Sequence, residues 1–143
     1  MMALVVLAAC SSGGVKNEAP FAQVMNWQID GNRLTASLRL RNVNDSKLEL
    51  QSLRLDVQLD GQPLSSYQGA HAVSIPANGF ETLELEMRAS NEGVALLQQL
   101  QDGARASLPY HLEGTVSTAD SGALAFERDG HLYTVPGRPG QFR

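Results

Sequence analysis

The chain has 143 residues, 43% of them hydrophobic, a size that suits one domain with a real core and not two domains. Eleven Lys and Arg against fifteen Asp and Glu give a net charge of −4, with no basic run. Because nucleic-acid binding depends on clustered basic side chains that neutralise phosphates, this balance argues against a nucleic-acid partner. We expect a single domain that is monomeric.

The chain begins with nine apolar, uncharged residues, and its only cysteine, Cys10, follows them directly. The run is far shorter than the roughly 20 residues that a membrane-spanning helix needs. The small side chains of Ala8 and Ala9 suit a signal-peptidase site. Leu7-Ala8-Ala9-Cys10 resembles a bacterial lipobox, which implies cleavage before Cys10 and lipidation of its thiol and new amino terminus.

The lipobox resemblance assigns residues 1–9 to a signal peptide remnant and residues 10–20 to a lipidated, flexible tether. A signal peptide normally opens with a positive region, and no Lys or Arg precedes Lys16, so we expect the true start upstream. In lipoproteins of this kind the residue after the cysteine influences sorting, and Ser11 resembles the outer-membrane pattern. The alternative is a short apolar N-terminus with a chance cysteine.

From Phe21 onwards, apolar residues recur at every second position, which is the period of a strand with one buried face. The first two predicted strands cover residues 25–29 and 34–40 and are joined by a hairpin turn at Asp30-Gly31. Their inward positions are Met25, Trp27, Ile29, Leu34, Ala36, Leu38 and Leu40. We therefore expect Trp27 to be a core residue and not a ligand platform.

A turn at residues 42–45 leads to a strand over residues 48–59, whose apolar phase slips by one position at Gln51-Ser52. Such a slip moves the buried face to the other side of the strand, so it predicts a bulge or break there. Asp60-Gly61 then predicts a second hairpin.

The middle of the chain contains more alternating strands and one helical segment. The predicted strands are a short one at residues 64–66 and longer ones at 71–75, 83–87, 108–112 and 124–126. A helix is predicted over residues 91–101, with Ser90 or Asn91 as its cap and Gly103 as its stop. Asp129-Gly130 predicts a turn into a last strand over residues 131–135, and residues 137–143 form a loose tail.

Several short strands separated by turn signals, with a single helix, predict an all-β fold. We expect an antiparallel immunoglobulin-like or fibronectin type III-like β-sandwich of about seven strands with one short helix, over residues 21–136. The two sheets would enclose one core.

The same region carries an ordered set of short motifs. They are Asn42-Val43-Asn44, the strand over residues 53–59 running into Asp60-Gly61, Ile75-Pro76-Ala77-Asn78-Gly79, the helix over residues 94–100, and Tyr110-His111-Leu112-Glu113-Gly114. This order resembles the late embryogenesis abundant (LEA) type 2 family, also called the water-stress and hypersensitive-response (WHy) domain. The resemblance implies a seven-stranded sandwich with a helix, found in plant stress proteins and bacterial lipoproteins, with a protective or binding role.

Catalytic and metal-binding patterns are weak in this sequence. His71, His111 and His131 lack metal-type spacing, and no cysteine within the domain could join them. There is no Gly-x-Ser-x-Gly elbow and no glycine-rich phosphate loop. Glu81, Glu84 and Glu86 could suggest paired carboxylates, but the last two fall on the solvent side of their strand. We expect no enzymatic activity, no cofactor and no metal.

Arg33, Arg39 and Arg41 form the one basic stripe, because residues two apart on a strand share a face. The stripe could contact anionic lipid head groups or cell-wall polymer. Alternatively it is an ordinary polar face balanced by cross-strand acids such as Asp56, and we favour this second interpretation because it is the default for a half-buried sheet.

These observations together predict a non-enzymatic lipoprotein, anchored through Cys10 to the periplasmic face of the outer membrane. It would act as a protective or binding module during desiccation or other stress, with an envelope protein, lipid or polymer as partner. An alternative is an interaction subunit that docks an envelope complex through an edge strand or the short helix. A weaker alternative is a carrier of an apolar ligand held between the sheets.

Overall fold

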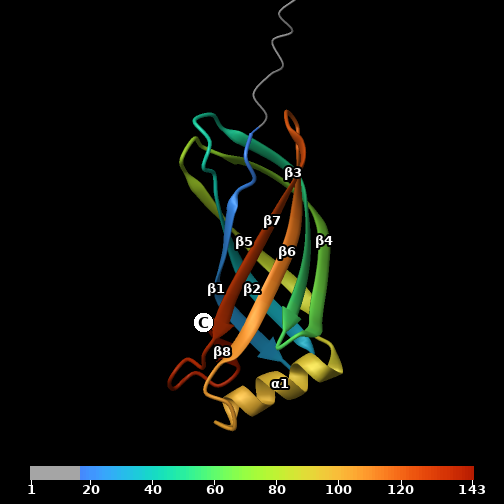
Figure 1. Cartoon of the computed structure of the whole chain (residues 1–143), viewed down its shortest axis with the longest axis vertical. Coiled ribbons are helices and arrows are strands. Elements are labelled where there is room, and N and C mark those ends of the chain that lie inside the picture. The colour runs from blue at the N-terminus through green and yellow to red at the C-terminus, as the bar shows by residue number, and fades with distance from the viewer. Residues whose placement is uncertain (1–16) are drawn as a thin grey trace, which may run out of the picture.

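The computed structural model describes residues 17–143 as two four-stranded antiparallel sheets packed face to face, with one helix across the end of the sandwich (Figure 1). The elements are β1 (Phe21–Asp30), β2 (Arg33–Arg41), β3 (Leu48–Leu59), β4 (Gln62–Ile75), β5 (Phe80–Arg88), α1 (Asn91–Gln101), β6 (Leu108–Thr118), β7 (Gly122–Leu132) and β8 (Gln141–Phe142). The strand orders are β5-β2-β1-β8 and β4-β3-β6-β7. The predicted sandwich with one short helix is confirmed, as seven long strands and the two-residue β8.

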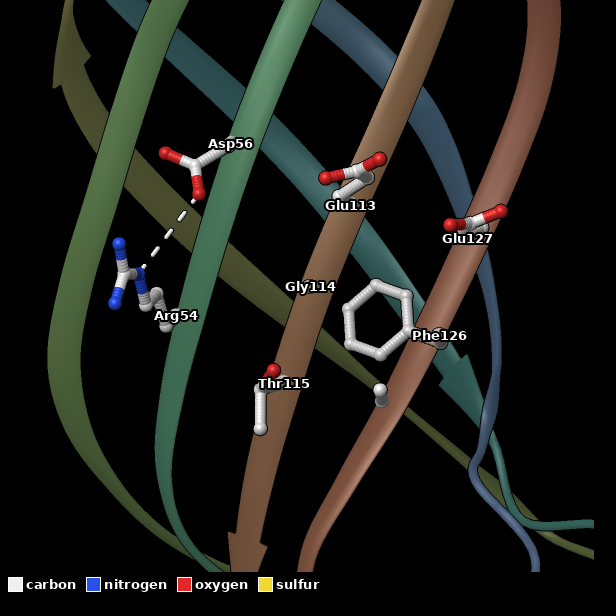
Figure 2. A pocket seen from close by; sticks show the side chains of 8 residues that line it. Arg54, Asp56, Glu113, Gly114, Thr115, Phe126 and Glu127 are labelled. Atoms are coloured by element: carbon white, nitrogen blue, oxygen red, sulfur yellow. Dashed lines mark ion pairs between the residues drawn. The ribbon is translucent and has the colours of Figure 1, made fainter.

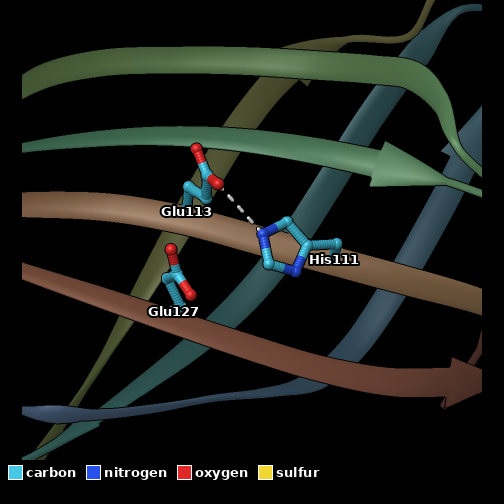
Figure 3. A group of neighbouring side chains, drawn as sticks. All are labelled: His111, Glu113 and Glu127. Atoms are coloured by element: carbon cyan, nitrogen blue, oxygen red, sulfur yellow. Dashed lines mark hydrogen bonds and ion pairs between the residues drawn. The ribbon is translucent and has the colours of Figure 1, made fainter.

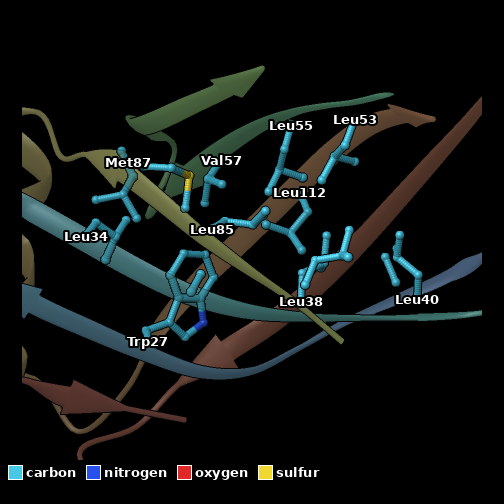
Figure 4. Close-up of a cluster of buried hydrophobic side chains, with 14 of the residues drawn as sticks. Trp27, Leu34, Leu38, Leu40, Leu53, Leu55, Val57, Leu85, Met87 and Leu112 are labelled. Carbon is cyan, nitrogen blue, oxygen red and sulfur yellow. The ribbon is translucent and has the colours of Figure 1, made fainter. Parts of the chain in front are cut away.

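The core lies between the inner faces of the two sheets (Figure 4). Trp27 on β1 is 1% exposed, and its ring meets the ring of Tyr110 on β6 edge-on, with 6.0 Å between the ring centroids. Leucines from β2 and β3, such as Leu38 and Leu55, fill the space around them and are fully buried. The alternation of the sequence therefore separates core residues from solvent-facing residues as expected, with Trp27 in the core.

Several predicted turns are present. Asp30 pairs with Arg33 across the first hairpin, and Leu59 pairs with Gln62 across the second. The register of β3 shifts between Leu50 and Ser52 on both of its neighbours, so the predicted bulge is confirmed. The bulge lets both halves of β3 bury their leucines, although the alternation of apolar residues shifts by one position between the two halves.

The helix α1 closes one end of the sandwich. Ser90 has an extended backbone, and its hydroxyl accepts a hydrogen bond from the Gly93 amide at 3.0 Å, which is a side-chain N-cap. Gly103 follows the helix with a φ of 78°, the left-handed conformation that glycine adopts most easily. Leu97 and Leu100 face the sheets and are buried.

Three local expectations were wrong. The register between β1 and β2 shifts between Val24 and Asn26, so Met25 sits at a bulge and is 41% exposed instead of buried. The predicted short strand at residues 64–66 and the strand at 71–75 are one continuous strand, β4. Asp129-Gly130 is not a turn but lies inside β7, where Gly130 lets the Tyr110 ring pack against its backbone.

The two ends of the domain are more ordered than expected. In the tail, β8 pairs with β1, with Phe142 opposite Trp27 and only 1% exposed, so residues 137–143 are not a loose tail. At the other end, the Glu18 amide donates to the Asn44 side chain at 2.8 Å, and the Asn17 amide donates to Ser121 at 3.2 Å. Residues 17–20 therefore belong to the domain, and only residues 10–16 remain for the expected tether.

Candidate functional site

Two aromatic side chains flank an arginine on the outer face of the β5-β2-β1-β8 sheet. Phe21 on β1 lies directly opposite Arg41 on β2, and Arg41 lies directly opposite Phe80 on β5. Arg39 precedes Arg41 by two positions and therefore lies on the same face. The chain enters the domain next to this row, at the end opposite α1 (Figure 1).

Two arginines stack on these rings. The guanidinium carbon of Arg39 lies 4.1 Å from the centroid of the Phe80 ring, and that of Arg128 on β7 lies 4.4 Å from the centroid of Phe21. Such cation–π contacts hold a guanidinium in place without neutralising its charge. The Nε atoms of both arginines are buried and have no hydrogen-bond partner among residues 17–143.

The surface formed by Phe21, Arg39, Arg41, Phe80 and Arg128 is called the Arg–Phe surface below. Phe21 is 47% exposed and Phe80 is 54% exposed, although phenylalanine is usually buried. Part of the surface is an open depression of about 380 Å³, within the size range of small ligand sites, to which Gln23 and Asn78 also contribute. The surface thus combines exposed aromatic rings with fixed positive charge.

The arginines of this surface have no acidic partner. Among residues 17–143, none of the ion pairs includes Arg39, Arg41 or Arg128. Arg33, the third member of the predicted stripe, differs because its Nε lies 3.3 Å from a Glu86 carboxylate oxygen.

The expectation that cross-strand acids such as Asp56 balance the basic stripe was right only for Arg33, whose partner is Glu86 on β5, and wrong for Asp56. Asp56 is on β3, in the other sheet, where it accepts a hydrogen bond from Ser66 at 2.7 Å and lies 3.8 Å from Arg54. The stripe is therefore divided into a paired end at Arg33 and an unpaired end at the Arg–Phe surface.

The outer face of the other sheet carries the opposite charge. Asp56, Glu113 and Glu127 lie opposite one another on β3, β6 and β7 and line a shallow depression above Gly114 and Phe126 (Figure 2). Like charges placed directly opposite across strands destabilise a sheet. The adjacent His111 offsets part of this repulsion, because its Nδ1 lies 2.6 Å from Asp129 and its Nε2 lies 3.1 Å from Glu113.

The carboxylates around His111 raise the pKa of its imidazole, chiefly through the hydrogen bond to Asp129 and then through the one to Glu113. His111, Glu113 and Glu127 can each offer a ligand atom to a metal ion, and these atoms lie within 4.8 Å of one another (Figure 3). Both ring nitrogens of His111 already have carboxylate partners, however. The cluster is satisfied as an ion-pair network when the imidazole is protonated.

The cluster could not be predicted from the sequence because His111 and Glu113 are on β6 whereas Glu127 and Asp129 are on β7. The other two histidines are separate from it: His71 shares a hydrogen bond of 2.6 Å with Tyr67, and His131 is exposed on β7. Glu84 and Glu86 are solvent-facing as predicted, and Glu84 accepts hydrogen bonds from Ser37. Cys10, the predicted lipidation site, lies outside the described residues.

Within residues 17–143, no helix combines the length and the apolar character needed to span a bilayer.

Comparison with known structures reveals similar folds at low sequence identity. A solution structure of an Arabidopsis thaliana protein has a TM-score of 0.57 and 10% identity, covering 88% of this chain and 85% of that one. An X-ray structure of a structural-genomics target has a TM-score of 0.52 and 12% identity, covering 85% of this chain and 90% of that one. Both similarities support the sandwich fold alone.

A comparison with curated proteins finds no match. The model of the LEA_2 family, described as late embryogenesis abundant protein, matches residues 37–128, which is more than half of the chain. The matched region runs from the middle of β2 to near the end of β7 and therefore includes strands of both sheets and α1, but not β1 or β8. The family is generally non-catalytic and suggests a stress-related protective role. This chain therefore belongs to the late embryogenesis abundant family LEA_2.

Proposed function

We propose that this protein is a lipid-anchored LEA_2 protein of the bacterial envelope that protects other molecules during water stress without catalysing a reaction. The main support for the proposal is the position at which the folded domain begins. Asn17 and Glu18 are held by hydrogen bonds at the end of the sandwich opposite α1. A lipid on Cys10 would therefore tether the domain by one end and leave both sheets and α1 free for partners.

The anchor is supported by the sequence Leu7-Ala8-Ala9-Cys10 and by the small, polar residues that follow it. One acyl chain alone binds a membrane only marginally, because each buried methylene contributes about 0.8 kcal/mol, whereas two or more chains hold firmly. Modification of both the Cys10 thiol and the new amino terminus would therefore give stable attachment. A Cys10→Ser variant should move from the membrane fraction to the soluble fraction.

The protective role is supported by membership of the LEA_2 family. The test is to dry a labile marker enzyme with the full chain carrying Cys10→Ser, rehydrate it and measure the remaining activity. We expect more activity than with an equal mass of an unrelated β-sandwich domain of similar size. If the marker enzyme retains no more activity than with the control domain, the protective role is wrong and the interaction subunit is the remaining alternative.

A further inference from the structure

We propose that the Arg–Phe surface docks the domain onto an anionic phospholipid bilayer. In this arrangement Phe21 and Phe80 enter the head-group region, while Arg39, Arg41 and Arg128 bind lipid phosphates. The inference goes beyond the proposed lipid anchor, which requires no contact between the folded domain and the membrane, and it depends on that anchor only to bring the surface close to a bilayer.

The arginines have the chemistry to bind phosphate. A guanidinium presents several N–H donors in one plane and matches the geometry of a phosphate. The stacked rings of Phe80 and Phe21 cover a face of Arg39 and of Arg128, and because the Nε atoms of both are buried, the terminal N–H groups are the donors left for an external acceptor. Within the described part of the chain no carboxylate forms an ion pair with either of them. Their positive charge is therefore available to an external anion.

The aromatic side chains favour a membrane over a free anion. A phosphate ion would need only the arginines, yet Phe21 and Phe80 expose about half of their surface on either side of Arg41. Val43, two residues after Arg41 in the loop between β2 and β3, is 42% exposed. Apolar groups next to basic ones are typical of surfaces that lie in the interface of an anionic bilayer.

The distribution of charge would orient the domain. The Arg–Phe surface is on the outer face of the β5-β2-β1-β8 sheet, with Arg128 reaching it from β7 of the other sheet, and the acidic row of Asp56, Glu113 and Glu127 is on the outer face of that other sheet. An anionic membrane attracts the Arg–Phe surface and repels the acidic row. The chain as a whole carries a net charge of −4, so docking would depend on this local separation of charge.

The length of the predicted tether permits the contact. Residues 10–16 link Cys10 to the ordered start of the domain at Asn17. Even fully extended, this segment spans about 25 Å, since each residue adds at most about 3.6 Å. Phe21 follows only four residues later, so a lipid on Cys10 would keep the Arg–Phe surface within reach of the bilayer.

The test uses the full chain with Cys10→Ser, so that no acyl chain contributes to binding. Co-sedimentation is measured with vesicles of phosphatidylcholine alone and with vesicles of equal parts phosphatidylcholine and phosphatidylglycerol. We expect binding to the second kind only, decreasing as salt is added. Arg39→Gln with Arg41→Gln should weaken it about 30-fold, the effect of removing two basic side chains beside an anionic surface.

The matched control is Arg33→Gln with Arg88→Gln, which removes the same charge from the same sheet face at its other end. For the aromatic side chains, Phe21→Ala with Phe80→Ala is compared with Tyr133→Ala, a ring that is 51% exposed. Thermal unfolding of every variant checks that it is folded. Equal binding to both kinds of vesicle, or equal losses in the surface and control pairs, would overturn the proposal.

Failure of the docking surface and failure of the lipid anchor can be distinguished. If the unsubstituted chain is acylated and fractionates with membranes while the Cys10→Ser chain ignores the anionic vesicles, the anchor stands and the docking surface is wrong. If the chain is not acylated but the Cys10→Ser chain binds those vesicles through Arg39 and Arg41, the docking surface stands and the lipid anchor is wrong.

Discussion

The side-chain amide of Asn42 donates a hydrogen bond to the backbone carbonyl of Ile75 at 3.1 Å and thereby joins the end of β2 to the end of β4 in the opposite sheet. The same amide also donates to the carbonyls of Ser46 and Pro76, and its oxygen accepts from Asn44. Asn42 is completely buried. One side chain thus supplies the loops at this end of the sandwich with polar partners that water cannot reach.

Substitution of Asn42 by Ala should destabilise the domain by about 3 kcal/mol, because several buried carbonyl groups would lose their donor and each unsatisfied polar group costs about 1–3 kcal/mol. Asn42→Asp should be at least as harmful, since it points a carboxylate at these carbonyl oxygens. Urea unfolding measures both effects. The control is Asn32→Ala, in an exposed turn. A loss equal to that of the control would refute this role for Asn42.

The substitution Gly93→Ala has two opposing effects on the free energy of unfolding. Alanine in a helix interior is more favourable than glycine by about 1 kcal/mol. A Cβ at position 93 would collide with the buried side chain of Leu64 on β4, however, and overpacking of a core costs about 1–3 kcal/mol. Gly93→Ala should therefore lower the free energy of unfolding, by roughly 1 kcal/mol net.

The coupling between these two positions provides the check. Leu64→Ala removes the colliding methyl groups, so Gly93→Ala should be less harmful, or even stabilising, in that background. A Gly93→Ala variant that is more stable than the unsubstituted protein would show that α1 can move away from Leu64 on β4 at little cost, which would contradict tight packing between them.

Phe142 fixes the C-terminal segment to the sandwich. Its ring is 1% exposed and lies opposite Trp27, so Phe142→Ala should destabilise the domain by about 3–5 kcal/mol, as expected for a buried aromatic residue. Tyr133→Ala, at an exposed ring, should have little effect. Thermal unfolding monitored by the fluorescence of Trp27 compares the two. Similar effects of both substitutions would indicate that the tail is loose after all.

His111 makes stability depend on pH. Because Asp129 and Glu113 raise the pKa of its imidazole above its ordinary value of 6.5, the protonated form is favoured in the folded state. Its contribution is present in full below the unfolded-state pKa and is lost as the pH rises through the higher folded-state pKa. The unsubstituted protein should exceed His111→Gln in Tm by more at about pH 5.5 than at about pH 8.5.

Equal Tm differences at the two pH values would contradict the proposed ion-pair network. NMR titration of the His111 ring is the direct measurement, with a midpoint above 6.5 expected. The same Tm measurements on His131→Gln, at an exposed site on β7, are the control.

The sheets could be predicted from the sequence because alternation is a local property of each strand. Even the change of phase at Gln51-Ser52 identified a bulge correctly. Met25 was misplaced because the inward phase of β1 changes from Ala22 and Val24 to Trp27 and Ile29, and the apolar Met25 between them fits the second phase in the sequence although it sits at the bulge. Asp129-Gly130 looks like a turn, but here glycine is needed for the close approach of the Tyr110 ring.

The candidate site could be predicted only in part. Arg39 and Arg41 share a visible stripe on one strand, whereas Phe21, Phe80 and Arg128 reach the same surface from three other strands and both sheets. The spacing of these residues along the chain has no fixed relation to their distance in space. For the same reason the contact of His111 with Asp129 could not be predicted, because it depends on the pairing of β6 with β7.

The lipid anchor is tested most directly by the intact mass of the protein extracted from envelopes, compared with that of a Cys10→Ser variant. We expect the mass of an acylated chain that begins at Cys10, together with membrane fractionation, and we expect the variant to lose both. An unmodified, soluble chain in both cases would contradict the anchor and leave a LEA_2 sandwich without covalent attachment to a membrane.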